Sequence, residues 1–411
     1  MKQTTYLKSI FSFTSLLLLA FSCTSSDETS EKTSVGKQYA SEKFDFEDEI
    51  TGMKKTGLTN SEHPDIKIYQ THPQWTSDSE FILFTSTRDT TNNHTEVFAV
   101  RESDGLIIQL TEDAKNIPSH LVLSRQKNLL YFIRSHQVVE LNLDVILPDE
   151  STSKDPVQSL RIISDLPSDA APSGSMSIDA NEQILYLGLQ HLDTDNPKSE
   201  DPKRWSLAAI DISTGEWREV VSLDWRIGHS QANPWKTGEI LFCHETGGDA
   251  PQRMWLINAN GQNLHPLFEE HPKDWVTHEV WADVDHVIFN MAGNQAYQRE
   301  RPSGIMMIDV RTNEHRLIDQ PPLEESQSGY WHCAISPDGR WIAGDTFEGL
   351  MYLINAQTGE RQLIGTGHRP DDSPKPHSHH HFSPDGNRVL LNAAPFGHTD
   401  LITIDISPLI K

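Results

Sequence analysis

Short apolar runs alternate with turn signals along most of the chain, and this pattern recurs about every fifty residues. The clearest copies are "HCAISPDGRWIAGD" from His332 and "HHFSPDGNRVLLNA" from His380. Each copy contains a short strand, a tight turn of the Ser-Pro-Asp-Gly kind or a relic of one, and a second apolar strand. Two further strands follow in most copies, joined by Thr-Gly or Asn-Gly hairpins. The pattern therefore predicts units of four antiparallel strands.

Seven such units fit between residue 44 and the end of the chain. The position four residues before the Ser of the turn, or its equivalent, recurs at spacings of 47 to 56 residues. Four-stranded units of this length are typical of propeller blades, whereas solenoid units are usually shorter. We therefore predict an all-β fold, a seven-bladed β-propeller with four antiparallel strands per blade over residues 44–411. Residues 42–58 should supply a strand that closes the ring against the last blade.

The N-terminus has a different composition. Residues 1–23 carry Lys2 and Lys8, then an apolar run, then Cys23, which is typical of a lipoprotein-type signal peptide. The apolar run is short for a transmembrane helix. Residues 24–43, rich in Ser, Thr, Glu and Lys, are predicted to form a disordered tether. We expect an exported, membrane-anchored lipoprotein, periplasmic or at the cell surface, lipidated at Cys23; ordinary cleavage nearby is the alternative.

The charge of the chain limits its partners. A net charge of −25 over 411 residues argues against nucleic acid as a binding partner, because both would be negatively charged. An anionic substrate would need a local cation, either a metal or a few arginines. Besides Cys23 the chain has only Cys243 and Cys333, and we expect two buried thiols rather than a disulfide.

Histidine occupies six of the seven equivalent positions, with Ser173 as the exception. A fixed point on the innermost strand of each blade should face the central channel near one end. The histidines should therefore converge in space: His72, His120, His229, His278, His332 and His379. The structural alternative is that the blade uses His in a buried hydrogen-bond network, as WD-type blades do.

A metal site is the chemistry that such convergence favours. His377 and His379 are two residues apart, so in a strand both rings point to the same side. His278, from another blade, could add a third ligand and leave an open position, as in catalytic centres. Imidazole suits Zn, Mn, Fe, Ni or Cu, so the residues alone do not choose the metal.

A second group of residues lies in the fourth unit: Arg226, His229, His244 and Arg253. A neutral His beside arginines and a metal is what proton abstraction from a uronic acid requires, because the cations stabilise the enolate-like charge. A His in a strand and a salt-bridged Arg are the structural alternatives. The chain has no G-x-S-x-G, phosphate-loop or dinucleotide fingerprint.

Several stretches resemble the oligogalacturonate lyases, seven-bladed propellers that cleave short pectin fragments by metal-assisted β-elimination. The most specific is "FCHETGGDAPQRMWLINANG" within 228–261, and others are "THEVWADVD" and "HSHHHFSPDG". The resemblance runs across 48–405. It implies that His244 is the general base, that His278, His377 and His379 bind Mn²⁺, and that Arg226 and Arg253 act on substrate carboxylates. We assign the other channel histidines His72, His229 and His332 to substrate binding.

The chain departs from the family pattern in two ways. The family usually has a Gln three residues before the H-x-H pair, and this chain has Pro374. Asp371, Asp372, His368 or water are alternatives for a fourth ligand. Such lyases commonly work in the cytoplasm, whereas residues 1–23 of this chain predict an export signal.

The sequence thus predicts an exported metal-dependent lyase that acts on short uronate oligosaccharides, with oligogalacturonate as the first candidate. The alternative is a non-catalytic, lipid-anchored propeller of the TolB-like kind that binds protein or glycan. A propeller hydrolase or peptidase-like domain that lacks its partner is a third reading.

Overall fold

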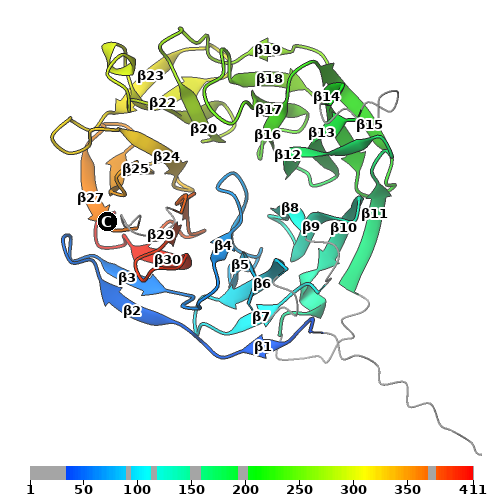
Figure 1. Cartoon of the computed structure of the whole chain (residues 1–411), viewed down its shortest axis with the longest axis horizontal. Helices are drawn as coiled ribbons and strands as arrows, with labels where there is room; N and C mark the ends of the chain where they lie inside the picture. The colour runs from blue at the N-terminus through cyan, green and yellow to red at the C-terminus, as the bar shows by residue number, and fades with distance from the viewer. Residues whose placement is uncertain are drawn as a thin grey trace, which may run out of the picture. The chain divides into compact units, whose positions relative to one another are not determined.

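The computed structural model describes residues 34–88, 94–112, 118–148, 159–192, 202–368 and 376–410. Within these ranges the strands form seven antiparallel sheets arranged as blades around a centre, which confirms the predicted propeller (Figure 1). Five blades have four strands, as predicted, but the first and last have five because N-terminal strands join their outer edges.

Each blade uses strands in nearly consecutive order. Blade one contains β4 (Asp65–Lys67), β5 (Phe81–Ser86), β6 (Glu96–Arg101), β7 (Ile107–Gln109) and β1 (Gln38–Tyr39). Blade two contains β8 (Ser119–Leu123), β9 (Leu129–Arg134), β10 (Gln137–Asn142) and β11 (Leu160–Asp165), with the 3₁₀ turn η1 (Leu143–Val145). Blade three contains β12 (Ala170–Ile178), β13 (Ile184–His191), β14 (Arg204–Asp211) and β15 (Trp217–Leu223).

The remaining blades follow the same order. Blade four contains β16 (Ile227–Ala232), β17 (Glu239–His244), β18 (Met254–Asn258) and β19 (His265–Pro266). Blade five contains β20 (Val276–Trp281), β21 (His286–Met291), β22 (Gly304–Asp309) and β23 (His315–Asp319), with η3 (Gln298–Glu300). Blade six contains β24 (Tyr330–Ile335), β25 (Trp341–Thr346), β26 (Met351–Asn355) and β27 (Arg361–Gly365). Blade seven contains β28 (His381–Phe382), β29 (Arg388–Ala393), β30 (Asp400–Asp405), β3 (Lys54–Gly57) and β2 (Phe44–Glu47).

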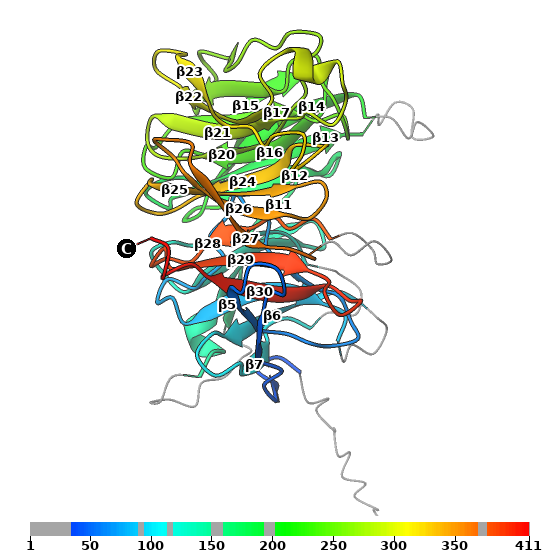
Figure 2. The same ribbon diagram turned by 90° about the vertical axis from the view of Figure 1, so that its left-hand side faces the viewer.

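The ring is closed by strands from opposite ends of the chain. β3 pairs antiparallel with β30, so the predicted closing segment does lie against the last blade. Figure 2 shows this blade in red with the blue N-terminal segment beside it. Lys55 Nζ lies 2.6 Å from Asp48 Oδ2, and both side chains are buried. Asp48 also accepts the backbone N–H of Thr366 at 2.8 Å, which ties the closing segment to blade six.

The predicted tether, residues 24–43, extends too far toward the C-terminus, because ordered structure begins before residue 43. Gln38 and Tyr39 form β1 and pair with Ile108 and Ile107 in blade one. The Tyr39 hydroxyl also donates to Gln109 Oε1 at 2.9 Å. Residues 1–33, including Cys23, lie outside the described residues. Within the described ranges no helix is long and apolar enough to cross a bilayer.

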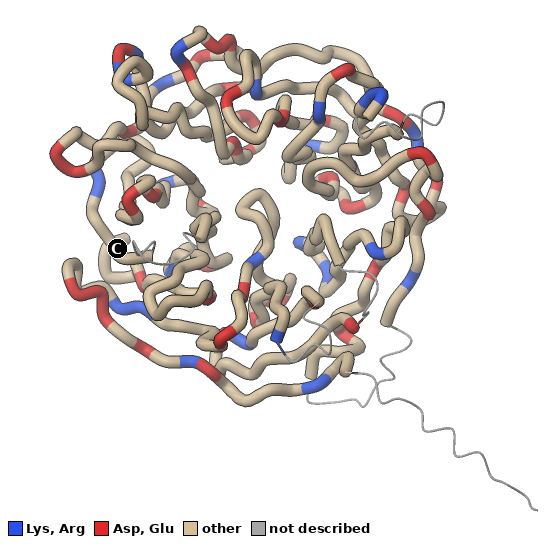
Figure 3. The backbone as a smooth tube through the Cα atoms, viewed as in Figure 1, with Lys and Arg blue, Asp and Glu red and all other residues tan. Residues whose placement is uncertain are grey.

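The core lies between neighbouring blades, because both faces of each sheet are covered. Leu83 and Ala99 of blade one pack with Leu130, Phe132 and Val139 of blade two in one buried cluster. Burial of such a side chain contributes roughly 2 kcal/mol. Cys243 and Cys333 are buried free thiols, as expected. Charged residues occur in blades all round the ring, but the first part of the loop after β4, residues 68–77, which reaches toward the centre, carries none (Figure 3).

A bulge in the innermost strands explains how the histidines reach the channel. Pairing registers shift between Ser119 and Val122, between Gly228 and Gln231, and between Thr277 and Val280. The residue at each shift adopts a left-handed backbone: His120 (φ 56°), His229 (φ 43°) and His278 (φ 52°), with His379 (φ 40°) alike in blade seven. Such bulges re-aim a side chain at the expense of backbone strain.

Candidate metal centre and active site

Four histidine rings from three blades converge near one end of the channel. They are His278 on β20, His332 on β24, and His377 and His379 just before β28. One ring nitrogen from each can be chosen so that all four lie within 4.8 Å of one another. The structure therefore brings together the three predicted ligands. It adds His332, which we had expected to contact substrate.

The orientation of His332 depends on a fully buried carboxylate. Asp345 Oδ1 accepts the backbone N–H of His332 at 2.9 Å and lies 2.9 Å from its Nδ1. Ser378 Oγ donates to Asp345 Oδ2 at 2.8 Å, and His368 Nε2 lies 3.3 Å from that oxygen. Burial opposes ionisation, yet these contacts hold the pKa of Asp345 well below its usual value. An ionised Asp345 keeps the proton on Nδ1 and leaves the Nε2 lone pair of His332 for a ligand.

The donor set suits a divalent metal. His332 Nε2 lies 3.3 Å from His377 Nδ1, so both nitrogens face a common point. Burial, followed by the neighbouring His332, lowers the pKa of His278 and His379 well below the usual value. Neutral imidazoles keep the lone pairs that metal ions need. His377 is exposed, so the cluster opens to solvent on that side.

The structure describes only some of the residues that the sequence offered as a fourth metal ligand. Asp371, Asp372 and Pro374 lie outside the described residues. His368 is buried against Asp345 and supports the cluster from behind rather than joining it. His332 therefore takes the fourth place among the residues that the structure describes.

Tyr69 links this cluster to blade four. Its ring lies 4.6 Å from that of His379 and 4.8 Å from that of His229. His229 Nε2 is 3.2 Å from Glu245 Oε2, and this hydrogen bond lowers the pKa of Glu245 to about 2. Cys243 lies close to both, but burial raises the pKa of its thiol well above the usual value. A thiol held protonated is a poor ligand, so this group is a weaker metal-site candidate than the four histidines.

Arg253 is a buried cation behind the histidine cluster. Its Nε donates to Glu279 Oε2 at 2.8 Å, and its Nη1 lies 3.9 Å from Glu245 Oε2. Its charge is among the causes that lower the pKa of His278. Arg253 is thus held by two carboxylates, and its side chain is only 5% exposed.

His244 and Arg226 lie at the same end of the channel as the cluster. β16 and β17 pair so that His244 faces Ile227, at the start of the innermost strand. His244 is half-buried, its ring lies 4.6 Å from that of Trp225, and burial lowers its pKa. Arg226 is exposed. Among the described residues no hydrogen bond or ring contact joins His244 to the four-histidine cluster.

The other channel histidines lie apart from this cluster. His72 is buried in the loop after β4, and His120 is half-buried beside Ser119 Oγ at 2.9 Å. Sequence reasoning also missed Tyr69, Glu279 and Asp345. Only Asp345 had a signal, because the hairpin of β24 and β25 pairs it directly with His332.

A family model described as oligogalacturonate lyase matches residues 201–407. The chain belongs to the oligogalacturonate lyase family. The matched region runs from β14 to β30 and contains His244, Arg253 and all four histidines of the cluster.

Curated relatives agree with this membership. The chain is 26% identical over 210 residues to the oligogalacturonate lyase of Dickeya dadantii (strain 3937), which is 46% of this chain. It is also 26% identical over 204 residues to the oligogalacturonide lyase of Pectobacterium atrosepticum, again 46% of this chain. Each alignment covers 52% of the relative, so the chain spans about half the length of the curated relatives it matches.

Solved structures of two similar proteins share the fold. An oligogalacturonate lyase in complex with manganese matches with a TM-score of 0.76 and 20% identity, covering 91% of this chain and 98% of that one. The oligogalacturonate lyase of Vibrio parahaemolyticus matches with a TM-score of 0.74 and 19% identity, covering 90% and 98%. At these identities the comparison supports the propeller architecture rather than individual residue roles.

Proposed function

We propose that this protein is a metal-dependent lyase that cleaves short uronate oligosaccharides, oligogalacturonate first among them, by β-elimination. The observation that carries the proposal is the four-histidine cluster, backed by buried Asp345 and open to solvent at His377. Family membership and the names of the curated relatives support the reaction class. The relative whose structure contains manganese supports Mn²⁺ as the first metal to test.

A divalent ion bound by His278, His332, His377 and His379 would supply positive charge that stabilises the substrate carboxylate as the C5 proton leaves. His244 would take that proton, because its lowered pKa keeps the ring neutral near pH 7. Trp225 packs against this ring and fixes its place. The electron pair left at C5 would form a double bond to C4 as the bond between C4 and its oxygen breaks, and the departing oxygen would take up a proton from solvent. Exposed Arg226 is free to bind a second carboxylate of the oligomer.

The test of activity is direct. Full-length protein is incubated with digalacturonate or trigalacturonate and Mn²⁺, and the ultraviolet absorbance of the 4,5-unsaturated product is followed. We expect the absorbance to rise over time when Mn²⁺ is present, and we expect this rise to stop when a chelator is added. If no uronate oligomer reacts and elemental analysis finds no metal, the protein is instead a non-catalytic propeller.

We also propose that the chain is exported, anchored through Cys23, and held away from the membrane by the polar segment that follows. The support is the sequence of residues 1–23 alone. Labelling of growing cells with a radioactive fatty acid should mark the wild-type protein but not Cys23→Ala. Labelling of both, or of neither, would contradict the anchor.

A further inference from the structure

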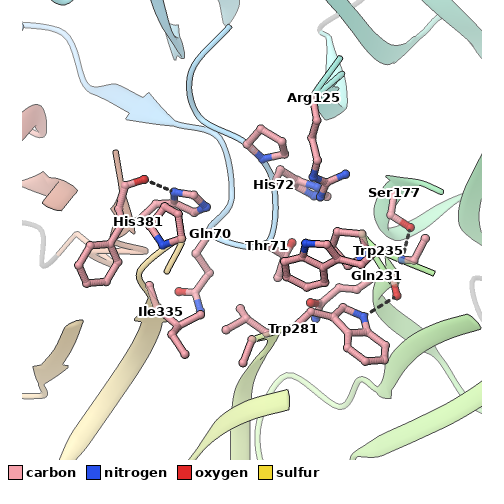
Figure 4. Close-up of a pocket in the computed structure, with 18 of the residues that line it drawn as sticks. Gln70, Thr71, His72, Arg125, Ser177, Gln231, Trp235, Trp281, Ile335 and His381 are labelled. Atoms are coloured by element: carbon pink, nitrogen blue, oxygen red, sulfur yellow. Dashed lines mark hydrogen bonds between the residues drawn. The ribbon is translucent and has the colours of Figure 1, made fainter. Parts of the chain in front are cut away.

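A cavity lies at the end of the channel away from the histidine cluster, bordered by the turns that follow the innermost strands. It encloses about 340 Å³, within the range of small-molecule sites. Figure 4 shows Arg125 and His72 on one wall, Trp235 and Trp281 below them, and His381 and Ile335 across the opening. Among the described residues that line it none is acidic, although the chain has 59 Asp and Glu.

This cavity is separate from the histidine cluster. β20 carries His278 near its middle and Trp281 at its end, so about 10 Å of strand separates the two levels. The loop after β4 lies between them. Its Tyr69 contacts the rings of His229 and His379, whereas Gln70 and His72 line the cavity. Gln70 Nε2 donates to the backbone oxygen of Cys333 at 3.3 Å, which fixes the loop across the channel.

Arg125 gives the cavity its charge. Arg125 is exposed, and within the described ranges its guanidinium forms no ion pair, although the charge of the nearby Glu182 acts on it. The nearby carboxylate of Glu182 instead accepts the backbone N–H of Arg125 and the hydroxyl of Ser124, both at 2.6 Å. Burial, followed by the charge of Arg125, lowers the pKa of His72 to about 3. The His72 ring is therefore neutral near pH 7, and Arg125 is the cationic side chain in the lining.

The remaining lining suits a polar ring. Trp235 is 54% exposed and presents its indole to the opening, while Trp281 is buried with its Nε1–H donated to Gln231 at 3.2 Å. Gln70 Oε1 is buried without a hydrogen-bond partner. A buried acceptor left unpaired is unfavourable, so a ligand hydroxyl that donates to it gains free energy.

We propose that this cavity binds a small ring compound bearing one carboxylate and hydroxyl groups, of the uronic-acid class. Arg125 pairs with the carboxylate, Gln70 accepts from a hydroxyl, and Trp235 packs against the ring. In an acidic protein this cation-lined cavity selects an anion by local charge. The proposal does not rest on the lyase activity, because none of these residues belongs to the histidine cluster.

The test is calorimetric titration of the full-length protein with galacturonate, alongside neutral galactose. We expect galacturonate to bind with and without a chelator, and galactose to bind at least about tenfold more weakly. Arg125→Gln should weaken galacturonate binding by about tenfold or more. Arg340→Gln, an exposed arginine in the corresponding turn of blade six, should leave it unchanged. Equal binding by Arg125→Gln, or no binding of galacturonate, overturns the proposal.

Further variants test whether galacturonate binds in this cavity or at the histidine cluster. Trp235→Ala should weaken binding, whereas Trp217→Ala, which removes an exposed indole on β15 away from the cavity, should not. His377→Ala removes a ring of the histidine cluster, and this variant should still bind galacturonate when a chelator is present. If His377→Ala abolishes binding, the observed site is the metal centre and the cavity proposal is wrong.

Discussion

Blades four to seven and blades one to three are built from the same repeat but differ in what their innermost strands carry. The histidine cluster draws all its rings from blades five, six and seven, and His244 comes from blade four. In blade two His120 has the same left-handed bulge as His278, yet its Nδ1 lies 2.9 Å from Ser119 Oγ, and it is not part of the four-histidine cluster. In blade three the left-handed residue is Gly174 (φ 80°), which has no side chain.

The bulge therefore belongs to the fold as a whole, whereas the histidine cluster depends on the particular side chains of a few blades. The bulge recurs around the ring and aims a residue at the channel wherever it occurs. A cluster forms only where adjacent blades place rings within reach and a carboxylate such as Asp345 orients one of them. The family match over residues 201–407 covers the blades that carry this chemistry.

The largest effect should come from removing a ring of the cluster. His379→Ala takes away one of four donors, and we expect loss of bound metal and a fall in turnover of about 10³-fold, beyond the 10–100-fold typical of supporting residues. Elemental analysis and the absorbance assay measure both. His120→Ala is the matched control, because it removes a ring from the equivalent bulge in blade two and should retain metal.

Removal of the proposed base should separate chemistry from metal binding. His244→Ala should lower kcat by about 10²–10⁴-fold with metal content unchanged, because proton transfer contributes on that scale. His265→Ala, an exposed histidine of the same blade, is the control. Near-normal turnover in His244→Ala would show that another group takes the proton.

A smaller effect is expected from the carboxylate behind His332. Asp345→Asn has nearly the same shape but no charge, so it should weaken metal affinity by about 10–100-fold, as measured by titration with Mn²⁺. Asp338→Asn changes an exposed carboxylate in the same blade and serves as the control. Equal affinities in the two variants would mean that Asp345 does not orient the ligand.

The smallest effect concerns acid stability in blade four. The hydrogen bond from His229 lowers the pKa of Glu245 from 4.5 to about 2. A carboxylate whose folded pKa is depressed contributes stability that is present above pH 4.5 and is lost as the pH falls toward 2. Allowing for partial solvent exposure, we expect about 1–2 kcal/mol. Urea unfolding of wild type and Glu245→Gln should differ near pH 6 and converge in acid; a constant difference would refute the linkage.

The repeat allowed the ring, its closure and three convergent histidines to be predicted, because turn chemistry and strand periodicity are local signals. The repeat placed His332 at the channel but did not predict that it joins the cluster. Its backbone is not left-handed as those of His278 and His379 are, and its ring is aimed by Asp345 across a hairpin. β1 was missed because two residues in a polar segment carry no periodicity, and their pairing with β7 depends on a distant blade.

The pairing of β3 with β30 has a consequence for the order of assembly. β3 is made early, but its partner β30 is made only when almost all of the chain has been synthesised. Pairing between strands so far apart in the sequence is intrinsically slow. His377 and His379 lie in the blade that this pairing completes. If the cluster binds a metal as proposed, uptake would come late in folding, and its time course during refolding would report when the last blade is completed.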